Sequence, residues 1–261
     1  MPVAPLAPLP DVYARAAPSA QAAVDLFAGE WSTILPEVDV HAGAIGLYAD
    51  PRIELFIDRS GGVHGRDVIE LGPLEASHTY MLERAGARVT AIEANSRAFL
   101  RCLVVKELVP LTRSRFLYGD FLPFLESTDM RPHLVVASGV LYHAPDPIRV
   151  LRAIARVADH IGIWTHHYDP ATMHGVDDHD RLFDPPVEHV VDGRRYQLHR
   201  RHYREALELA GFCGGTERSA VWMELADIVG LLEDLRYEVE VATNDLHHPH
   251  GAAVLLHARR G

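Results

Sequence analysis

Short apolar segments alternate with helical segments through the middle of this sequence, and this alternation constrains the fold more than any other feature. The apolar segments lie at residues 66–71, 88–94, 115–120, 133–139 and 160–167, and helical patterns at 78–87, 97–108 and 146–158 separate most of them. Strands that are apolar on both faces and alternate with helices are typical of a parallel sheet covered by helices on both sides. The alternation therefore predicts a doubly wound α/β fold.

The alternation stops after residue 167, where the chain predicts an insertion followed by the far edge of the sheet. Residues 167–221 form the insertion, in which 187–200 predicts a β-hairpin with Asp192-Gly193 at its turn and 204–211 a short helix. A helix at 223–235 and strands at 237–243 and 251–260 follow. Because a loop rather than a helix precedes the last strand, we expect a mostly parallel seven-stranded sheet with an antiparallel last strand.

Residues 1–62 are expected to form a Pro-rich lead-in and a helical cap before the main domain, which spans 63–261. The lead-in has no basic segment followed by a long apolar one, so it does not resemble a signal peptide. Helical patterns follow at 19–30, where Ser19 suits the N-cap, and at 50–59, where Pro51 suits the first helical position.

Composition narrows the class of protein. The chain has 261 residues and a formal net charge of -11, which argues against binding to the phosphates of nucleic acid. No apolar run approaches the roughly 20 residues of a membrane-spanning helix. Two cysteines, Cys102 and Cys213, cannot build a disulfide framework or a cysteine-based zinc site. We therefore expect a cytoplasmic protein.

Residues directly after the predicted strands carry most of the functional information, because ligands of such sheets bind at the carboxyl ends of the strands. Glu93 lies 21 residues after Gly72, a spacing that suits a carboxylate accepting hydrogen bonds from a ribose diol. Asp120 can accept from an exocyclic amine such as that of adenine, and Phe121 can cover a ring face. Asp120 also suits the N-cap of the following helix, and the two roles are compatible.

The segment ELGPLEA at 70–76, followed by AIEANSRAFLRCLVVKEL, FLYGDFLPFL and LVVASGVLYHAPDPIRVL, resembles the class I S-adenosylmethionine (SAM)-dependent methyltransferases. The SGVLYH segment and the DP after it resemble the branch that includes the tRNA wobble-uridine carboxymethyltransferases. The resemblance covers roughly residues 65–165, with Leu74 and Ala76 in place of the second and third glycines of the first motif.

The resemblance implies a Rossmann-like fold and SAM as the cofactor. The residues that it would assign to the cofactor are Glu70, Gly72, Pro73, Leu74, Glu93, Ala94, Gly119, Asp120, Phe121, Ser138, Gly139 and Val140. Basic residues for the extra carboxylate of carboxy-SAM cannot be located, which favours ordinary SAM.

Tyr142, His143 and His166 are the candidate catalytic residues on the acceptor side. His143 has an ordinary pKa of about 6.5, so it can take a proton from a hydroxyl or amine as a methyl group is transferred. Packing on the cofactor or fixing the loop before Pro145 is the alternative role. Methyl transfer can also proceed by positioning alone.

The insertion concentrates histidines and arginines. Eight of the 17 histidines lie between His160 and His202, but their spacing with the neighbouring aspartates matches no zinc template, so we expect no metal. Arg194, Arg195, Arg200, Arg201 and Arg204 form either an anion or RNA site, or a solvated hairpin balanced by nearby acids. Trp31, Tyr48, His78 and Tyr80 are candidates for the pocket rim or for packing.

These features favour transfer of a methyl group from SAM to an oxygen or nitrogen of a small molecule, such as a sugar or secondary metabolite. A tRNA- or RNA-modifying methyl- or carboxymethyltransferase and a non-catalytic SAM-binding protein remain as alternatives. A nicotinamide-dependent oxidoreductase would require G-x-G-x-x-G, where this chain has G-P-L-E-A. The expected partner is a small-molecule acceptor, with neither nucleic acid nor membrane, and the oligomeric state stays open, a homodimer included.

Overall fold

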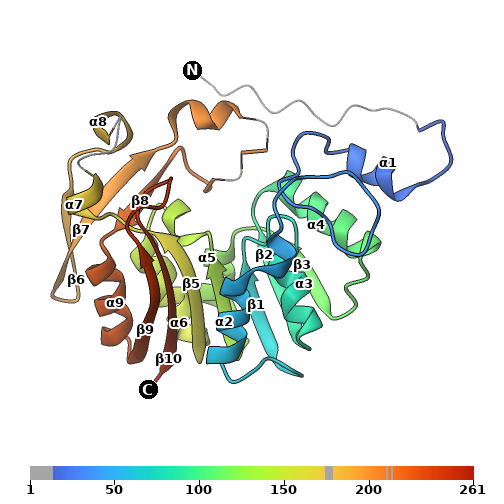
Figure 1. The fold of residues 1–261 in the computed structure, drawn as a ribbon. Helices are drawn as coiled ribbons and strands as arrows, with labels where there is room; N and C mark the ends of the chain where they lie inside the picture. The colour runs from blue at the N-terminus through green and yellow to red at the C-terminus, as the bar shows by residue number, and fades with distance from the viewer. Residues whose placement is uncertain (1–13, 174–178, 210, 213) are drawn as a thin grey trace.

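A seven-stranded sheet forms the centre of the computed structural model, which describes residues 14–173, 179–209, 211–212 and 214–261 (Figure 1). Its strand order is β3 (Ser114–Tyr118), β2 (Arg88–Glu93), β1 (Asp67–Leu71), β4 (Leu134–Ser138), β5 (His160–His166), β10 (Ala253–Arg260) and β9 (Tyr237–Asp245). Strands β1 to β5 pair in parallel, whereas β10 is antiparallel to both of its neighbours. The predicted α/β fold with an antiparallel last strand is confirmed.

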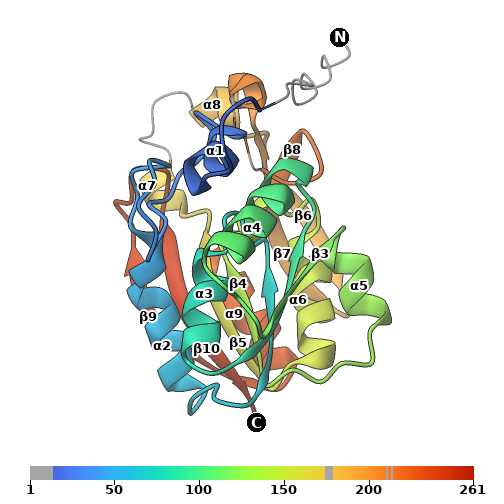
Figure 2. The ribbon, with the colours of Figure 1, turned by 90° about the vertical axis from the view of Figure 1, so that its right-hand side faces the viewer.

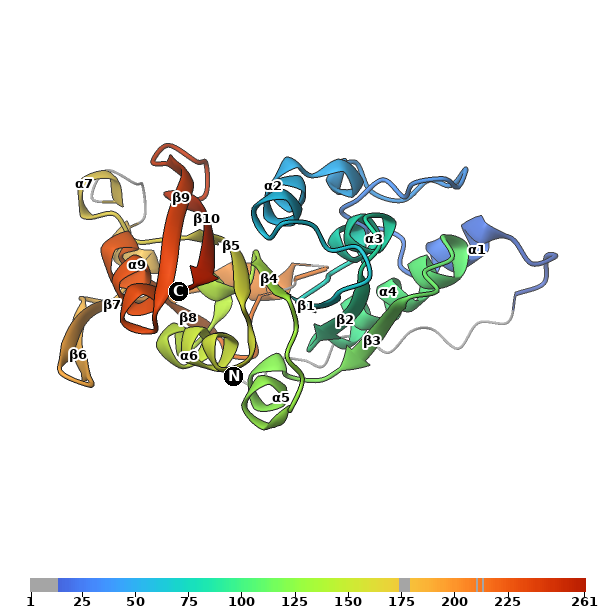
Figure 3. The same ribbon diagram turned by 90° about the horizontal axis from the view of Figure 1, so that it is seen from below.

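Helices cover both faces of the sheet (Figure 3). One layer holds α2 (Pro51–Arg59), α3 (Ser77–Arg84) and α4 (Ser96–Leu108), and the other holds α5 (Phe121–Ser127), α6 (Pro147–Val157) and α9 (Leu225–Asp234). Successive residues of β4 enter opposite layers, with Val136 in the first and Val135 in the second. Burial on both faces explains why these strands are apolar throughout instead of alternating.

The strand order reverses direction beside β1, which pairs with β2 on one side and with β4 on the other. The connection after β1 crosses to one edge and the connection after β3 crosses to the other. A crevice forms at such a switch point, outside the carboxyl ends of the strands. The fold therefore places the ends of β1 to β4 around one potential binding site.

The N-terminal cap contains two helices, as expected. Ser19 accepts a hydrogen bond from the backbone N–H of Ala22 and caps α1 (Ala20–Asp25), which is shorter than the predicted helix at 19–30. Turns follow α1, and Phe27 packs edge-to-face on Trp31, so the chain bends toward the main domain where a longer helix was expected. A short 3₁₀ helix, η1 (Leu47–Ala49), precedes α2, which begins at Pro51 as predicted.

The insertion contains a second sheet of three antiparallel strands, β6 (Val187–Val191), β7 (Arg194–His202) and β8 (Ser219–Met223). Asp192 and Gly193 connect β6 to β7 with φ of 50° and 84°, as the predicted hairpin turn requires. The expected helix at 204–211 is a 3₁₀ helix, η3 (Arg204–Glu208). The sequence did not predict strand β8. This strand ends at Met223, so the small sheet extends two residues beyond the predicted end of the insertion at 221.

The small sheet and α1 lie at the same end of the main sheet, opposite the C-terminus (Figures 1 and 2). The remaining short helices are η2 (Leu141–His143), α7 (Pro170–Met173) and α8 (His179–Leu182). Among the described residues, no helix combines the length and apolarity needed to span a membrane.

Candidate functional site

A cavity of about 450 Å³ opens at the carboxyl ends of β1 to β4. Its wall includes most of the predicted cofactor residues, namely Gly72, Pro73, Leu74, Glu93, Ala94, Asp120, Phe121, Ser138, Gly139 and Val140. The candidate catalytic residues Tyr142 and His143 also line it, whereas Glu70, Gly119 and His166 lie outside the wall. The fold thus brings together predicted site residues that are up to 71 positions apart in the sequence, from Gly72 to His143.

The loop after β1 has an unusual backbone. Gly72, Leu74 and Ala76 have φ of 63°, 53° and 59°, in the left-handed region that glycine adopts most easily. Leu74 and Ala76 occupy this region despite carrying a Cβ, at a cost of roughly 1–2 kcal/mol each. A Cβ on Gly72 would lie 2.6 Å from Cγ1 of Val140, so the loop approaches the end of β4 too closely for a larger residue.

Glu93 ends β2 with its carboxylate in the cavity wall. The backbone N–H of Asn95 donates to Oε1 at 2.8 Å, and that of Leu74 donates to Oε2 at 3.1 Å. Burial raises the pKa of Glu93, while these two backbone donors act in the opposite direction. The donors orient the carboxylate and leave lone pairs on both oxygens for a ligand with two hydroxyls.

Asp120 serves the N-cap of α5 and also lines the cavity. Its Oδ1 accepts from the backbone N–H of Leu122 at 2.8 Å, which stabilises the start of the helix. The side chain remains exposed at the cavity, next to Phe121. Both roles considered for Asp120 are therefore geometrically compatible.

Glu70 lies behind the wall and is almost completely buried. The hydroxyl of Thr79 donates to its Oε2, and Nδ1 of His78 is 4.0 Å from its Oε1. Within the described part of the chain, Oε1 has no hydrogen-bond partner. Burial raises the pKa of Glu70 to about 7. Glu70 therefore does not line the cavity, and its implied role in holding the cofactor stays a prediction.

His143 lies in η2 with its ring fixed by the insertion. Its Nδ1 is 2.8 Å from the hydroxyl of Tyr203, which also accepts a hydrogen bond from the backbone N–H of Gly215. Burial lowers the pKa of His143 to about 4, and the positive charge of Arg201 lowers it further. His143 is therefore uncharged at neutral pH.

His166 sits at the end of β5, behind Tyr142. Its Nδ1 is 2.9 Å from the carbonyl oxygen of Gly251, and its ring stacks on that of Trp222 with centroids 5.3 Å apart. Burial lowers its pKa to about 4. His166 meets the ring of Tyr142 edge-on at 4.7 Å, so in this structure it supports a wall residue.

Several wall residues escaped the sequence analysis, among them Leu47, Arg52, Asn95, Trp164 and the segment 214–216. The guanidinium of Arg52 binds Asp50 and lies 4.5 Å from the ring centre of Trp164. Nothing in the local pattern around Arg52 indicates a pocket, since the cap reaches the site only through the tertiary fold. Asn95 directly follows the predicted strand at 88–94, and this position at a strand end could have identified it as a site residue.

The four aromatic and histidine candidates for the rim have different roles. His78 lines the cavity, with Nε2 3.0 Å from Oδ2 of Asp50. Tyr48 donates to the carbonyl oxygen of Glu75, Tyr80 to Glu37, and the indole of Trp31 to the carbonyl oxygen of Val24. The last three residues make structural contacts outside the cavity wall.

Residues 211–212 and 214–216 of the insertion contact residues on two sides of the cavity. The side chain of Asn95 donates to the carbonyl oxygen of Phe212 at 3.2 Å, and a Cβ on Gly215 would lie 2.1 Å from the carbonyl oxygen of His143. These residues therefore touch both the β2 side and the β4 side of the site.

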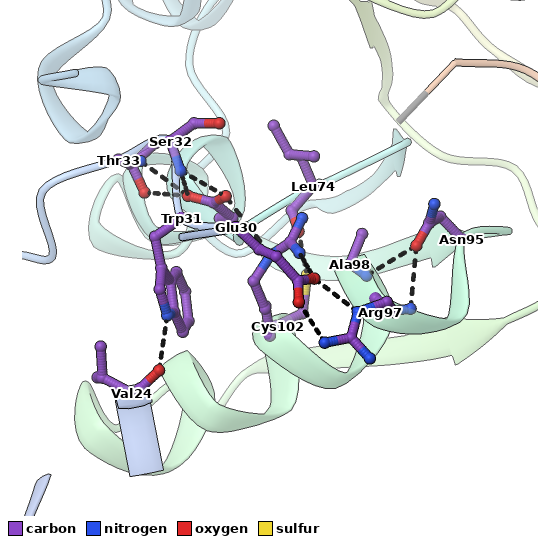
Figure 4. A network of polar contacts seen from close by, with 12 residues as sticks. Val24, Glu30, Trp31, Ser32, Thr33, Leu74, Asn95, Arg97, Ala98 and Cys102 are labelled. Carbon is purple, nitrogen blue, oxygen red and sulfur yellow. Dashed lines mark hydrogen bonds and ion pairs between the residues drawn. The ribbon is translucent and has the colours of Figure 1, made fainter. Parts of the chain in front are cut away.

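A buried ionic network joins the N-terminal cap to the loop after β1 (Figure 4). Glu30 pairs with Arg97 and, at 3.2 Å, with Nη1 of Arg101. Nε of Arg101 is 3.5 Å from Oε1 of Glu75, which also accepts from the backbone of Ser32. Arg101 is only 2% exposed, so its charge depends on these two carboxylates.

No cluster of three metal-binding side chains occurs within the described ranges. His174, Asp177 and Asp178, which belong to the histidine-rich part of the insertion, fall outside those ranges.

No family model and no curated protein matches the sequence. Solved structures do match. The N-terminal domain of EvdMO1, solved with S-adenosylhomocysteine (SAH) and D-fucose, is 22% identical with a TM-score of 0.67, over 93% of this chain and 95% of that one. The chain spans 43% of the EvdMO1 chain in another structure of that protein.

Two further matches carry methyltransferase names. Magnesium protoporphyrin IX methyltransferase from Synechocystis PCC 6803, with bound SAH, is 15% identical with a TM-score of 0.56, over 85% of this chain and 90% of that one. The 1,6-didemethyltoxoflavin-N1-methyltransferase of Burkholderia thailandensis is 15% identical with a TM-score of 0.53, over 82% and 78%. The chain has the fold of SAM-dependent methyltransferases. At these identities the finer resemblance to the wobble-uridine branch stays a prediction.

Proposed function

We propose that this protein is a SAM-dependent methyltransferase that modifies an oxygen or nitrogen of a small molecule, such as a sugar or secondary metabolite. The observation that carries the proposal is the convergence of Glu93, Asp120, Gly72 and Gly139 on one cavity at the switch point of a sheet with the methyltransferase fold. Such convergence at a switch point is the general location of ligands in open α/β sheets.

The residues around the cavity fit the chemistry of SAM. Glu93 would accept hydrogen bonds from the ribose hydroxyls, because its two backbone donors leave lone pairs on both oxygens. Asp120 and Phe121 would contact the adenine. Gly72 and Gly139 would leave room for the amino-acid part. When bound, SAM supplies an electrophilic methyl group.

Tyr142 and His143 would orient the acceptor. His143 is uncharged at neutral pH because of its burial, so it adds no positive charge near the binding site of a cationic cofactor. Its hydrogen bond to Tyr203 holds the ring in one orientation, which contributes to positioning the acceptor atom.

Two observations support a small-molecule acceptor. The matching structures name small molecules: one was solved in the presence of D-fucose, and the names of two others contain 1,6-didemethyltoxoflavin and magnesium protoporphyrin IX. The net charge of -11 also opposes a polyanionic acceptor such as tRNA.

Isothermal titration with SAM, SAH and NAD tests the proposal. We expect SAH to bind with a Kd in the micromolar range or tighter, and NAD to give no binding heat. Binding of NAD in preference to SAH would contradict the proposal and restore the oxidoreductase alternative. Binding of SAH without transfer of labelled methyl to any compound of a sugar and metabolite panel would favour the non-catalytic alternative.

A further inference from the structure

Arg201 differs from Arg195, Arg200 and Arg204 because its guanidinium is partly buried, and among the described residues it has no carboxylate partner. Among the described residues it makes no side-chain hydrogen bond or ion pair, and its guanidinium lies over the ring of Trp222, 5.4 Å from the centroid. Its surroundings are aromatic, and burial lowers its pKa. A cation withdrawn from water in this way is costly unless an anion approaches it.

The neighbouring arginines are compensated. Arg194 binds Asp234 at 2.9 Å, Arg195 lies 3.5 Å from Glu188, and Arg204 donates to the carbonyl oxygen of Arg181. Arg200 donates to Ser219 and lies 4.0 Å from Asp184. Nearby acids therefore balance most of the positive charge of the hairpin, which agrees with the predicted solvated hairpin. None of these acids pairs with Arg201.

The alternation of β7 directs Arg201 toward the acceptor end of the cavity. Arg200 and His202 both reach Asp184 on one side of the strand, so Arg201 between them points to the opposite side. Its charge acts on His143 and on the tyrosines Tyr142 and Tyr203. Arg201 is not itself a wall residue, but Tyr142 and His143 are, and the indole of Trp222, over which Arg201 lies, donates to the carbonyl oxygen of Tyr142.

We propose that Arg201 is the binding residue for an anionic group of the acceptor, a carboxylate or a phosphate, carried at a distance from the methylated atom. The planar guanidinium can donate two parallel hydrogen bonds to either oxyanion. The acceptor then spans from Tyr142 and His143, beside the reacting atom, to Arg201 on the small sheet. This assignment of the acceptor class rests on the proposed methyltransferase function.

Matched pairs of small probes test the charge preference. The full-length protein saturated with SAH is titrated with glucuronate and glucose 6-phosphate against glucose, and with 4-hydroxybenzoate against 4-hydroxybenzamide. We expect at least one anionic probe to bind ten-fold or more tightly than its neutral counterpart. The R201Q variant should lose this preference while its Kd for SAH stays within two-fold of the wild type.

The R200Q variant is the matched control, because it removes the same charge from the next residue on the solvent side of β7. It should keep the preference, and R201K should keep part of it. A preference that is equal in R201Q and the wild type, or absent from the wild type for every pair, would overturn the proposal. The proposal would also be overturned if R201Q had a lower melting temperature but unchanged probe binding, because Arg201 would then serve only to pack on Trp222.

The same titrations without SAH separate this proposal from the preceding one. Anion binding that depends on Arg201 in a protein that fails to bind SAH would defeat the SAM proposal and retain the anion site. Binding of an RNA oligonucleotide that R201Q abolishes, with no binding of the small anions, would overturn the small-molecule assignment.

Discussion

At the scale of single residues, two buried carboxyls near the cavity differ in how they are compensated. Glu93 receives two backbone N–H donors, whereas Glu70 receives one hydroxyl and has an unpartnered Oε1 among the described residues. Burial raises the pKa of Glu70 to about 7, and its single hydroxyl donor offsets only part of this effect, so the group carries a partial charge at neutral pH. Glu93 is the better carboxylate for a ligand, because its charged form is already oriented.

Replacing Glu93 with Ala should weaken SAH binding by about 1.5–3 kcal/mol, or roughly 10- to 150-fold, the range for hydrogen bonds to a charged group. Titration calorimetry measures the change. Glu107→Ala, at an exposed site on α4, is the control and should bind SAH like the wild type. Equal affinities for the Glu93 variant and the wild type would remove the ribose assignment.

At the scale of elements, the cofactor loop depends on the N-terminal cap as well as on the sheet. Arg101 of α4 contacts Glu75 in the loop and Glu30 in the cap, so three segments share one buried cation. Tyr48 adds a hydrogen bond from the cap to the backbone of Glu75 at 2.6 Å. These contacts help to hold the loop in which Leu74 and Ala76 adopt left-handed backbone conformations.

Arg101→Met should destabilise the protein by about 3–5 kcal/mol, because it leaves Glu75 buried without its cationic partner. It should also weaken SAH binding through the loop. Arg97→Met is the comparison: Arg97 is 20% exposed and pairs with Glu30. In urea denaturation, Arg97→Met should lower the free energy of unfolding by clearly less than Arg101→Met. Similar losses in the two variants would show that the buried network does not support the loop.

The elements also show which parts of the site can be predicted from sequence. Glu93 ends a strand, Asp120 and Gly139 come soon after strands, and strand ends are recognisable from local patterns. Arg52, the segment 214–216 and Arg101 reach the site or its loop from regions brought together by the tertiary fold, and no local pattern carries that information. His166 also ends a strand, but its ring contacts the carbonyl oxygen of Gly251 and is not part of the cavity wall.

At the scale of the whole molecule, buried histidines make the fold sensitive to acid. His143, His166 and His257 each have a pKa lowered to about 4, with burial as the main cause. In the unfolded chain they titrate near 6.5, so between these values the unfolded state binds more protons. Glu70 has the opposite effect below about pH 7, because burial raises its folded-state pKa. Smaller upward pKa shifts of Glu93, Glu224 and Asp227 act with Glu70, and the lowered pKa of His160 acts with the three histidines, whose large shifts dominate.

The free energy of unfolding should therefore fall as the pH is lowered from about 6.5 to about 4. Each net proton taken up on unfolding contributes about 1.4 kcal/mol per pH unit. Urea denaturation across this range measures the slope. His257→Gln, remote from the cavity wall, should make the slope shallower by one proton, and an unchanged slope would contradict the assignment of His257 to this effect.

A crystal structure of the SAH complex tests the central claim most directly. The account predicts the ribose hydroxyls on Glu93, the adenine beside Asp120 and Phe121, and the sulfur facing Tyr142 and His143. SAH bound elsewhere, or bound in the cavity with its ribose away from Glu93, would contradict it.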